Sequence, residues 1–226
     1  MKKENYIVLI PARKNSKRLK NKNKKLLLNK PLISHSIEYA LNYFSNDQIW
    51  VNSDDHELKD IAKKYNINFY DRKKELAEDE TTTNLVVRDF CQNLINQEFE
   101  NIITLQPTNP IRSRDLMIDS IKQYEKSGRH SLMSVSVLHK KFGSLRDNIY
   151  HPENYKIGQR HQDIENLYYE NGQIYISSKN AIINLGNYIS EDVFPFITNE
   201  IGSQIDIDHA IDFNLAELIM KNQKLL

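Results

Sequence analysis

The sequence contains little glycine, and all of it lies in the second part of the chain. Six of the 226 residues are glycine, and the first of them is Gly128. The Walker A loop and the GxGxxG dinucleotide fingerprint both need glycines where an early strand meets the helix that follows it. Both loops are therefore excluded before Gly128, and any phosphate bound by this part of the chain must be held in another way.

The chain also has a single cysteine, almost no net charge and no long apolar run. The single cysteine, Cys91, can form neither an internal disulfide nor a Cys-based zinc cluster, so nothing indicates an oxidising compartment. A net charge of +1 argues against a bulk nucleic-acid binder. No run approaches the roughly 18 apolar residues that span a bilayer, and the run after Lys2 and Lys3 ends at Pro11. We expect a cytoplasmic protein with no membrane partner.

Short apolar runs alternate with segments of helical period, which is typical of βαβ units and a mostly parallel α/β sheet. The sequence is 39% hydrophobic and 27% charged, as in ordinary globular proteins. The predicted strands cover residues 7–10, 49–51, 67–70, 102–105, 132–138 and 172–177. The predicted helices cover residues 33–44, 58–65, 86–95, 117–124 and 211–219.

The segment from residue 139 to residue 170 breaks this alternation. It is polar, contains two glycines and has no clean period. We interpret it as an insertion, either a small subdomain or a dimer arm, in a core formed by residues 1–138 and 171–226.

Polar residues follow the predicted strands where each one ends. Ligands of open parallel sheets bind outside the carboxyl ends of the strands, so these residues are expected to converge on one edge. Asp54 and Asp55 follow the second strand, where they would order a loop, reach the site or, the favoured interpretation, cap a helix. The other segments at strand ends are residues 11–18, 71–72 and 106–110.

The segment after the first strand is strongly basic. Eight basic residues and no acidic residue lie between positions 13 and 25, although the whole chain is nearly neutral. Lysine supplies point charge and arginine supplies paired donors, so this loop favours a polyphosphate ligand. The alternatives are a solvated loop or a nucleic-acid patch, and the absence of aromatic residues counts against the second.

Four segments resemble the signatures of one enzyme family. Residues 10–23, 105–112, 171–176 and 205–208 are similar, in the same order, to motifs of the acylneuraminate cytidylyltransferases, the CMP-sialic acid synthetases and related CMP-nonulosonic acid synthetases. The resemblance implies a Rossmann-like, three-layer nucleotidyltransferase fold with a dimerisation insertion. It also implies that a sugar acid attacks the α-phosphate of CTP, giving pyrophosphate and a CMP-sugar for cell-surface polysaccharide biosynthesis.

The resemblance also implies a role for individual residues. The nucleotide-binding positions are Arg13, Asn15, Ser16, Lys22, Asn23, Arg72 and Thr83. The sugar-binding positions are Gln106, Arg160, Gln162 and Tyr175. The catalytic positions are Arg13, Lys22, Asp206 and Asp208, and the last two would also hold Mg²⁺ or Mn²⁺. A homodimer, with the insertion reaching the partner's site, is implied as well.

Three features of this chain depart from the family pattern or fit it in more than one way. His161 separates Arg160 from Gln162, which the family carries as an adjacent pair. Relatives commonly have glycines where this chain has Lys14, Asn15 and Arg18. Asparagine tolerates left-handed backbone geometry, so Asn15 would keep the turn. For Lys14 and Arg18 the alternatives are that these positions need no positive φ or that the loop has a different shape. Tyr175 fits core packing as well as sugar contact.

Asp206 and Asp208 flank Ile207, and alternation along a strand would place both carboxylates on one face. Mg²⁺ is usually bound by one or two carboxylates together with substrate phosphates, so the pair fits a metal that bridges protein and CTP. The alternative is that Asp208 caps the helix that begins near His209. With the resemblance we favour the metal, and Asp208 would serve both purposes.

Several alternatives remain at the level of sequence. The acceptor would be a sialic-acid-like sugar, legionaminate, pseudaminate or Kdo, and Kdo ranks last because its enzymes are expected to have an acidic residue in place of residues 106–108. No general base is evident. A nucleic-acid-binding module that uses the basic loop is the alternative from a different class, and its binding would fall steeply with salt.

Overall fold

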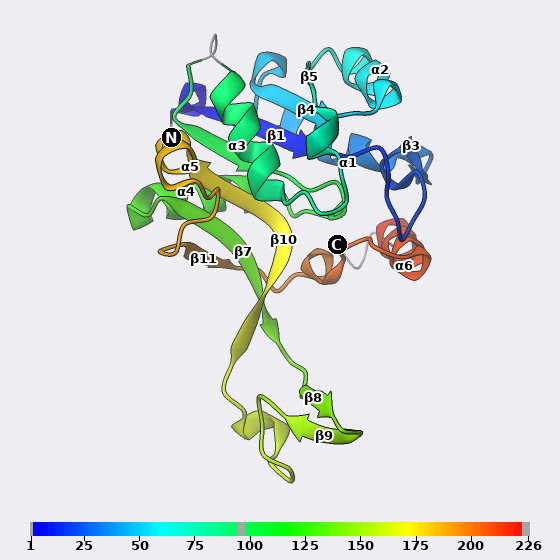
Figure 1. Ribbon diagram of the computed structural model, residues 1–226, viewed down its shortest axis with the longest axis vertical. Helices are drawn as coiled ribbons and strands as arrows, with labels where there is room; N and C mark the ends of the chain where they lie inside the picture. Colours follow the sequence, from blue (N-terminus) through cyan, green and yellow to red (C-terminus); the bar gives the residue numbers. More distant parts are fainter. Residues whose placement is uncertain (1, 95–97, 223–226) are drawn as a thin grey trace.

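A computed structural model describes residues 2–94 and 98–222 (Figure 1). In this part of the chain, seven strands form one sheet in the order β11-β7-β10-β6-β1-β4-β5. They are β1 (Tyr6–Pro11), β4 (Ile49–Ser53), β5 (Asn68–Asp71), β6 (Asn101–Thr104), β7 (Ser131–Leu138), β10 (Leu167–Ser178) and β11 (Phe194–Ile197). The four other strands make two small ribbons: β2 (Leu26–Leu27) with β3 (Lys30–Pro31), and β8 (Gly143–Arg146) with β9 (Ile149–Pro152).

The described chain contains six α-helices, five between strands and one after the last strand. They are α1 (Leu32–Leu41), α2 (His56–Lys64), α3 (Thr83–Asn93), α4 (Leu116–Ser127), α5 (Lys179–Leu185) and α6 (Ala210–Lys221). Short 3₁₀ turns are η1 (Lys3–Asn5), η2 (Lys22–Lys24), η3 (Asn46–Gln48), η4 (Lys74–Leu76), η5 (His161–Asp163) and η6 (Ile201–Gln204). Position 95, the expected end of the third helix, lies outside the described residues. No helix within residues 2–94 and 98–222 is long and apolar enough to cross a bilayer.

The predicted mostly parallel sheet is confirmed. β1 pairs in parallel with β4 and β6, β4 with β5, and β7 with β11. β10 runs antiparallel to both of its neighbours, β6 and β7. β11 and α5 were not predicted; β11 has the sequence Phe-Pro-Phe-Ile and lies at the edge of the sheet, where a proline is tolerated because its missing N–H faces no partner.

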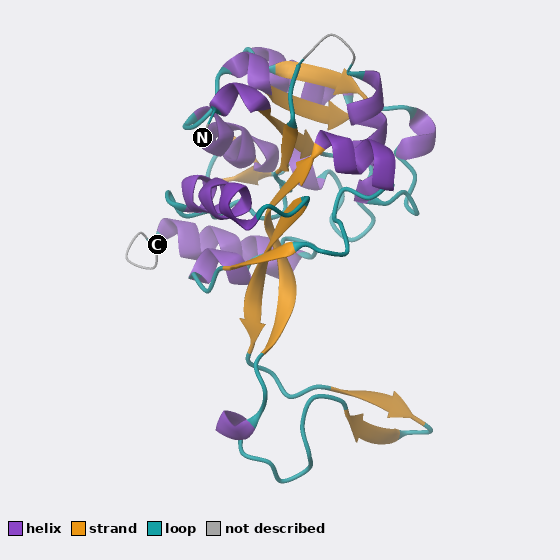
Figure 2. Ribbon diagram, turned by 90° about the vertical axis from the view of Figure 1, so that its left-hand side faces the viewer, coloured by secondary structure: helices purple, strands orange, loops and turns teal. Residues whose placement is uncertain are grey.

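Helices cover both faces of the sheet, so the protein has three layers (Figure 2). Along β1, Val8 and Ile10 pack in one cluster with residues of α1, α2 and α4. Ile7 and Leu9 point the other way and pack in a second cluster with α3 and α5. This buried alternation is why the first strand appears in the sequence as a continuous apolar run.

A third apolar cluster lies beside the sheet and fixes the C-terminal part of the chain. Phe213 and Ile219 of α6 pack there with Leu32 at the start of α1. Ile205 and Ile207 belong to the same cluster and are 3% and 0% exposed. The segment that contains the two predicted metal ligands is therefore anchored through its alternate, apolar side chains.

The segment that we predicted as an insertion projects from the core as an arm (Figures 1 and 2). β8, β9 and η5 lie in it. β10 starts earlier than predicted, because Leu167–Glu170 pair with Val135–Leu138 of β7. The ladder shifts register between Glu170 and Tyr175, where the two strands pass from the sheet into the arm.

Candidate active site

The ends of three strands meet at one polar cavity of about 470 Å³. Pro11 ends β1, Arg72 follows β5 and Gln106 follows β6, and all three line it. The predicted convergence of strand ends on one edge is confirmed for these strands. Residues lining the cavity are Pro11, Ala12, Arg13, Ser16, Lys17, Arg18, Leu19, Lys22, Asn23, Arg72, Asp79, Thr81, Thr83, Val86, Gln106, Pro107, Thr108, Asp206 and Asp208.

The strand that we predicted second contributes to the cavity indirectly. Asp55 caps α2, because its side chain accepts a hydrogen bond from the Glu57 N–H at 3.0 Å. Asp54 orders the basic loop instead, since its Oδ1 accepts from the Lys14 N–H at 2.8 Å. Asn15, a predicted nucleotide-binding residue, does not line the cavity. It lines a neighbouring hollow together with Asp54.

The basic loop achieves its shape without the glycines of the family pattern. Asn21, which precedes η2, is the loop residue in the left-handed region, with φ 56° and ψ 29°. Lys14, Asn15 and Arg18 have no positive φ, so Asn15 does not supply a left-handed turn, and the alternative that these positions need no positive φ is confirmed. Asn23 is buried and its Nδ2 donates to the Arg13 carbonyl oxygen at 3.1 Å, which fixes the start of the loop against its end.

Asp206 and Asp208 both line the cavity while Ile207 between them is buried, as the alternation predicted. The segment is extended but pairs in no ladder, so the predicted strand is wrong. Its backbone is held by the Ile207 N–H, which donates to the Thr108 carbonyl oxygen at 2.8 Å. Asn109 Nδ2 donates to the Ile205 carbonyl oxygen at 2.8 Å. The segment after β6 therefore positions both carboxylates.

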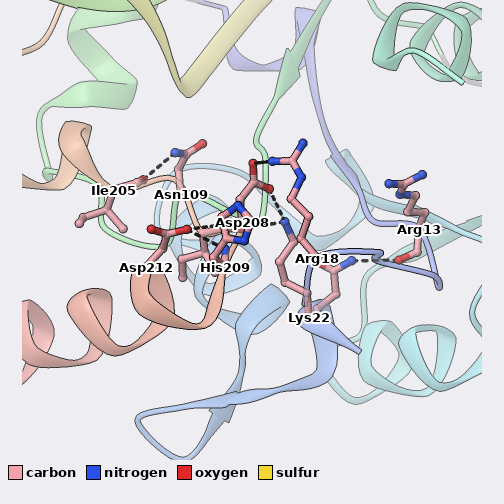
Figure 3. Close-up of polar contacts among 10 residues, drawn as sticks. Arg13, Arg18, Lys22, Asn109, Ile205, Asp208, His209 and Asp212 are labelled. Carbon is pink, nitrogen blue, oxygen red and sulfur yellow. Dashed lines mark hydrogen bonds and ion pairs between the residues drawn. The ribbon is translucent and has the colours of Figure 1, made fainter. Parts of the chain in front are cut away.

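Asp208 does not cap α6. His209 and Asp212 form the capping box, and Asp212 Oδ2 accepts from the N–H groups of His209 at 2.7 Å and of Asp208 at 3.0 Å. The Asp208 side chain faces the basic loop, where Arg18 Nη1 contacts Oδ2 and Lys22 Nζ donates to Oδ1 at 3.1 Å (Figure 3). The alternative role of Asp208 as a helix cap is therefore wrong, and its carboxylate belongs to the site.

The surroundings of Asp206 and Arg72 shift the pKa values of both side chains in the cavity. Burial raises the pKa of Asp206, the negative Asp208 raises it further, and a hydrogen bond from Thr108 opposes both effects. Burial lowers the pKa of Arg72 to about 10, so this residue stays protonated at neutral pH. Its Nε and Nη2 donate to the side chain and the backbone of Asn52 at 2.6 and 2.9 Å, and neither contact neutralises the guanidinium. Arg72 thus presents a positive charge to an anionic ligand.

The donor set fits a hard divalent cation that is shared with a phosphate ligand. Within the described residues, no group of three or more His, Cys, Asp and Glu side chains is arranged to hold a metal ion by itself. Asp206 and Asp208 both line the cavity. Mg²⁺ is usually bound by one or two protein carboxylates together with substrate phosphates, so these two carboxylates are sufficient.

The predicted sugar-binding residues lie in three different places. Gln106 lines the cavity. Tyr175 is 1% exposed, donates to Glu170 and packs against the ring of Tyr188, so core packing accounts for it in this chain. Arg160 and Gln162 lie in the arm, where Arg160 Nε pairs with Asp163 Oδ2 at 2.7 Å. The fold does not bring these two arm residues to the cavity of their own chain.

Sequence reasoning missed two residues that shape the site. Asp79, beyond η4, forms ion pairs with Arg13 at 2.8 Å and Lys17 at 2.7 Å. Arg112 donates to the Gln106 carbonyl oxygen at 2.8 Å and so holds the segment after β6. Arg112 belongs to a motif that we recognised, but Asp79 lies in a short acidic run that has no distinguishing spacing.

Residues 7–226 match the family described as "Cytidylyltransferase". The CMP-N,N'-diacetyllegionaminic acid synthase of Legionella pneumophila is 32% identical over 97% of this chain and 98% of its own length. The N-acylneuraminate cytidylyltransferase of Escherichia coli is 29% identical over 96% of this chain, which spans only 52% of that protein. A pseudaminic acid cytidylyltransferase of Campylobacter jejuni is 28% identical over 95% of this chain and 96% of its own length.

Solved structures support the fold alone, since their sequences are distant. A CMP:2-keto-3-deoxy-manno-octonic acid synthetase in complex with CTP aligns with a TM-score of 0.69 at 14% identity, over 96% of this chain and 99% of that one. The 4-diphosphocytidyl-2C-methyl-D-erythritol synthase of Anaerococcus prevotii gives 0.67 at 14% identity, over 97% of this chain and 100% of that one. The predicted three-layer nucleotidyltransferase fold is confirmed.

Proposed function

Because this chain belongs to the cytidylyltransferase family, we propose that it joins the CMP part of CTP to a nonulosonic acid and releases pyrophosphate. The observation that carries the proposal is the convergence of three strand ends, the basic loop and the Asp206–Asp208 segment on one polar cavity. Its volume of about 470 Å³ lies in the range of roughly 300–1,000 Å³ that small-molecule sites occupy.

In this reaction the anomeric hydroxyl oxygen of the sugar acid forms a bond to the α-phosphorus. The bond between that phosphorus and the oxygen leading to the β-phosphate breaks with its electron pair on that oxygen, pyrophosphate leaves, and the hydroxyl proton passes to solvent. Such a transfer needs little covalent chemistry from the protein, which has to align the reactants and stabilise the phosphate charges.

The cations around the cavity meet that second requirement. Arg13, Lys22 and Arg72 come from two separate segments, and each lines the cavity. In the proposed complex they contact the phosphates, while Ser16 and Thr83 offer hydroxyl groups to the nucleotide. Asn23 acts on the loop itself, because its hydrogen bond to the Arg13 carbonyl sets the loop's closure.

Asp206 and Asp208 are the proposed ligands of Mg²⁺ or Mn²⁺. When bound, the cation supplies positive charge and Lewis acidity to the phosphate groups. Asp206 is the more available of the two carboxylates, because Asp208 is already paired with Arg18 and Lys22.

The nucleic-acid alternative receives no support from the loop, since many of its cations have acidic partners within the chain. Arg13 and Lys17 pair with Asp79, and Lys24 pairs with Asp55 at 3.0 Å. A phosphate backbone would have to compete with these carboxylates. Of these carboxylates only Asp79 lines the cavity, and a metal on Asp206 and Asp208 would offset part of the negative charge that a triphosphate meets there.

A homodimer is part of the proposal, and the arm supports it. Leu145, Ile149 and Ile157 are large apolar residues of the arm, and all three are exposed. Exposed apolar side chains on a projecting element are typical of a surface that packs against another protein. In a symmetric dimer the arm would carry Arg160 and Gln162 to the partner's cavity, where they would meet the sugar carboxylate.

The proposed acceptors are sialic-acid-like sugars, with legionaminate and pseudaminate as alternatives and Kdo last. Legionaminate belongs in the test panel, because the Legionella pneumophila synthase is 32% identical over 97% of this chain and 98% of its own length. We propose the cytoplasm as the compartment, which is consistent with a single buried thiol, and cell-surface polysaccharide as the destination of the sugar.

The test is pyrophosphate release by the purified protein with CTP, Mg²⁺ and a panel of nonulosonic acids. We expect release with at least one acid of the panel, none without an acid, and little when ATP replaces CTP. Silence across the whole panel would contradict the proposed function.

A further inference from the structure

Both carboxylate oxygens of Asp208 are occupied by cations of the chain itself. Arg18 Nη1 contacts Oδ2, and Lys22 Nζ donates to Oδ1 at 3.1 Å (Figure 3). Arg18 and Asp208 are 190 positions apart in the sequence, so the contact ties the basic loop to the segment that leads into α6. A metal ion on Asp208 would need the same oxygens that these two side chains now hold.

The two cations are held very differently. Lys22 has a second acceptor, the Ile207 carbonyl oxygen at 2.7 Å, and its side chain is only 12% exposed. The Arg18 side chain is 60% exposed. It forms a hydrogen bond to Asp208. Exposed ion pairs are weak, so Arg18 can exchange this partner at low cost while Lys22 stays in place.

Arg18 also has a second binding option in the same cavity. Its side chain lines the space in which the triphosphate of the proposed substrate would lie. A guanidinium binds phosphate oxygens through paired, charge-assisted hydrogen bonds, which are stronger than an exposed contact to a single carboxylate oxygen. A bound nucleotide would therefore favour the conformation in which Arg18 contacts the phosphates and has left Asp208.

We propose that Arg18 is a positioning residue that occupies the cation place on Asp208 in the ligand-free protein and moves to the phosphates when nucleotide and metal are bound. This inference rests on the proposed function, since it needs the metal site at Asp206 and Asp208. It predicts that a divalent cation alone binds weakly, because it must compete with Arg18. Nucleotide then raises the affinity for the cation, and by linkage the cation raises the affinity for nucleotide.

The test is a titration with Mn²⁺ alone, followed through the electron paramagnetic resonance signal of the free ion. Arg18→Ala should bind Mn²⁺ roughly three- to fivefold more tightly than the wild type, the range expected when an exposed ion pair no longer competes. Arg18→Lys should remain close to the wild type. Lys20→Ala removes the same charge from an exposed position of the same loop and should also leave the affinity unchanged.

A second titration, with a non-hydrolysable CTP analogue present, measures the coupling. The analogue should raise the affinity of the wild type for Mn²⁺ by a larger factor than that of Arg18→Ala. Equal Mn²⁺ affinities for Arg18→Ala and wild type, together with a loss in Asp206→Asn, would overturn the role of Arg18 and leave the metal site intact. If Asp206→Asn binds Mn²⁺ as the wild type does, with and without the analogue, both the metal site and this inference are wrong.

Discussion

Two aspartates, Asp206 and Asp208, lie two positions apart and line the same cavity, yet their surroundings differ. Asp208 is neutralised by Arg18 and Lys22. Asp206 has a raised pKa, because burial and the charge of Asp208 both disfavour its ionised form. The Asp206 side chain is also exposed at the cavity, whereas Asp208 is already paired. At the residue scale, Asp206 is therefore the more available of the two proposed metal ligands, and its substitution tests that proposal directly.

Asp206→Asn tests this at the proposed metal site. Loss of one of two carboxylate ligands should lower turnover on the order of 100-fold or more, since a bound metal contributes several kcal/mol to charge stabilisation. The fold should stay intact and the melting temperature should not fall, because the side chain is exposed and asparagine has nearly the same shape. Circular dichroism and the pyrophosphate assay measure the two effects. Asp60→Asn, at an exposed position of α2, is the control and should change neither.

Arg112 is the second residue whose role is local and testable. Burial lowers its pKa to about 10, and its guanidinium donates to the carbonyls of Gln173 and Gln106, each at 2.8 Å, and to Ser36 Oγ at 3.0 Å. Lysine keeps the charge but lacks the planar set of donors that satisfies three acceptors at once.

Arg112→Lys should therefore cost about 2–3 kcal/mol of unfolding free energy, the range for leaving buried acceptors unpaired near a charge. The KM for the sugar acid should rise more than the KM for CTP, because Arg112 holds the backbone of Gln106. Urea denaturation and steady-state kinetics measure these effects. Arg114→Lys, two positions along on the exposed surface, should change neither; equal behaviour of both variants would contradict the positioning role.

At the scale of elements, the basic loop owes its shape to a turn at Asn21 and to contacts that reach across the sequence. Asn21 has a φ of 56°, a geometry that alanine adopts only with strain. Lys14 and Arg13 are then fixed by Asp54 and Asp79, which lie after β4 and before α3. The loop is thus a product of one local backbone preference and several distant acids.

A pair of substitutions separates these two contributions. Asn21→Ala should lower the unfolding free energy by about 1 kcal/mol and raise the KM for CTP, whereas Asn21→Gly should be nearly neutral for the loop geometry. Asn15→Ala is the matched control, because Asn15 has no positive φ and faces the neighbouring hollow. Thermal unfolding and CTP kinetics provide the measurements. A larger loss in Asn15→Ala than in Asn21→Ala would show that the turn lies elsewhere in solution.

Element boundaries also show what sequence patterns can and cannot predict. β1, β4 and β6 were predicted within two residues at each end, because buried parallel strands appear as uninterrupted apolar runs. β10 was predicted to start at residue 172 but starts at Leu167. Its first residues, Leu-Tyr-Tyr-Glu, alternate between half-buried and exposed, so no apolar run marks them.

At the scale of the whole molecule, the arm separates two sets of residues that the proposed reaction needs together. The cavity lies at the strand ends of the core, whereas Arg160 and Gln162 lie at η5. That part of the chain belongs to the arm that projects from the core (Figure 1). A second copy of the chain would unite them if each arm covers the partner's cavity. The proposed dimer therefore makes a prediction that a monomer does not.

Mixing two inactive variants tests whether the arm acts in trans. Arg160→Ala and Asp206→Asn, mixed and allowed to exchange subunits, should recover about a quarter of the wild-type activity, since half of the dimers would contain one complete site. Each variant alone should be nearly inactive. The recovery is measured as pyrophosphate release after subunit exchange, with a covalently cross-linked mixture as the control that cannot exchange. No recovery between variants that do form mixed dimers would place Arg160 outside the partner's site.

The sequence by itself determined the class of the fold, the family and most of the cavity. Alternating apolar runs and helical periods encode the sheet, since burial of these side chains drives folding. The basic loop and the Asp-Ile-Asp segment predicted the cavity, because each is a short pattern whose chemistry is local, and the family resemblance added Gln106.

Only the tertiary structure decided which charges neutralise one another. Asp208 faces Arg18 and Lys22 and leaves the capping of α6 to His209 and Asp212, and Asp79 faces Arg13. These pairs join segments that are distant in the chain, and their partners are selected by how the layers pack. The same packing placed Tyr175 in the core and carried Arg160 away on the arm. The periodicity of the sequence predicts on which face of a helix or strand a side chain lies. Which residue it contacts there depends on how the whole chain folds.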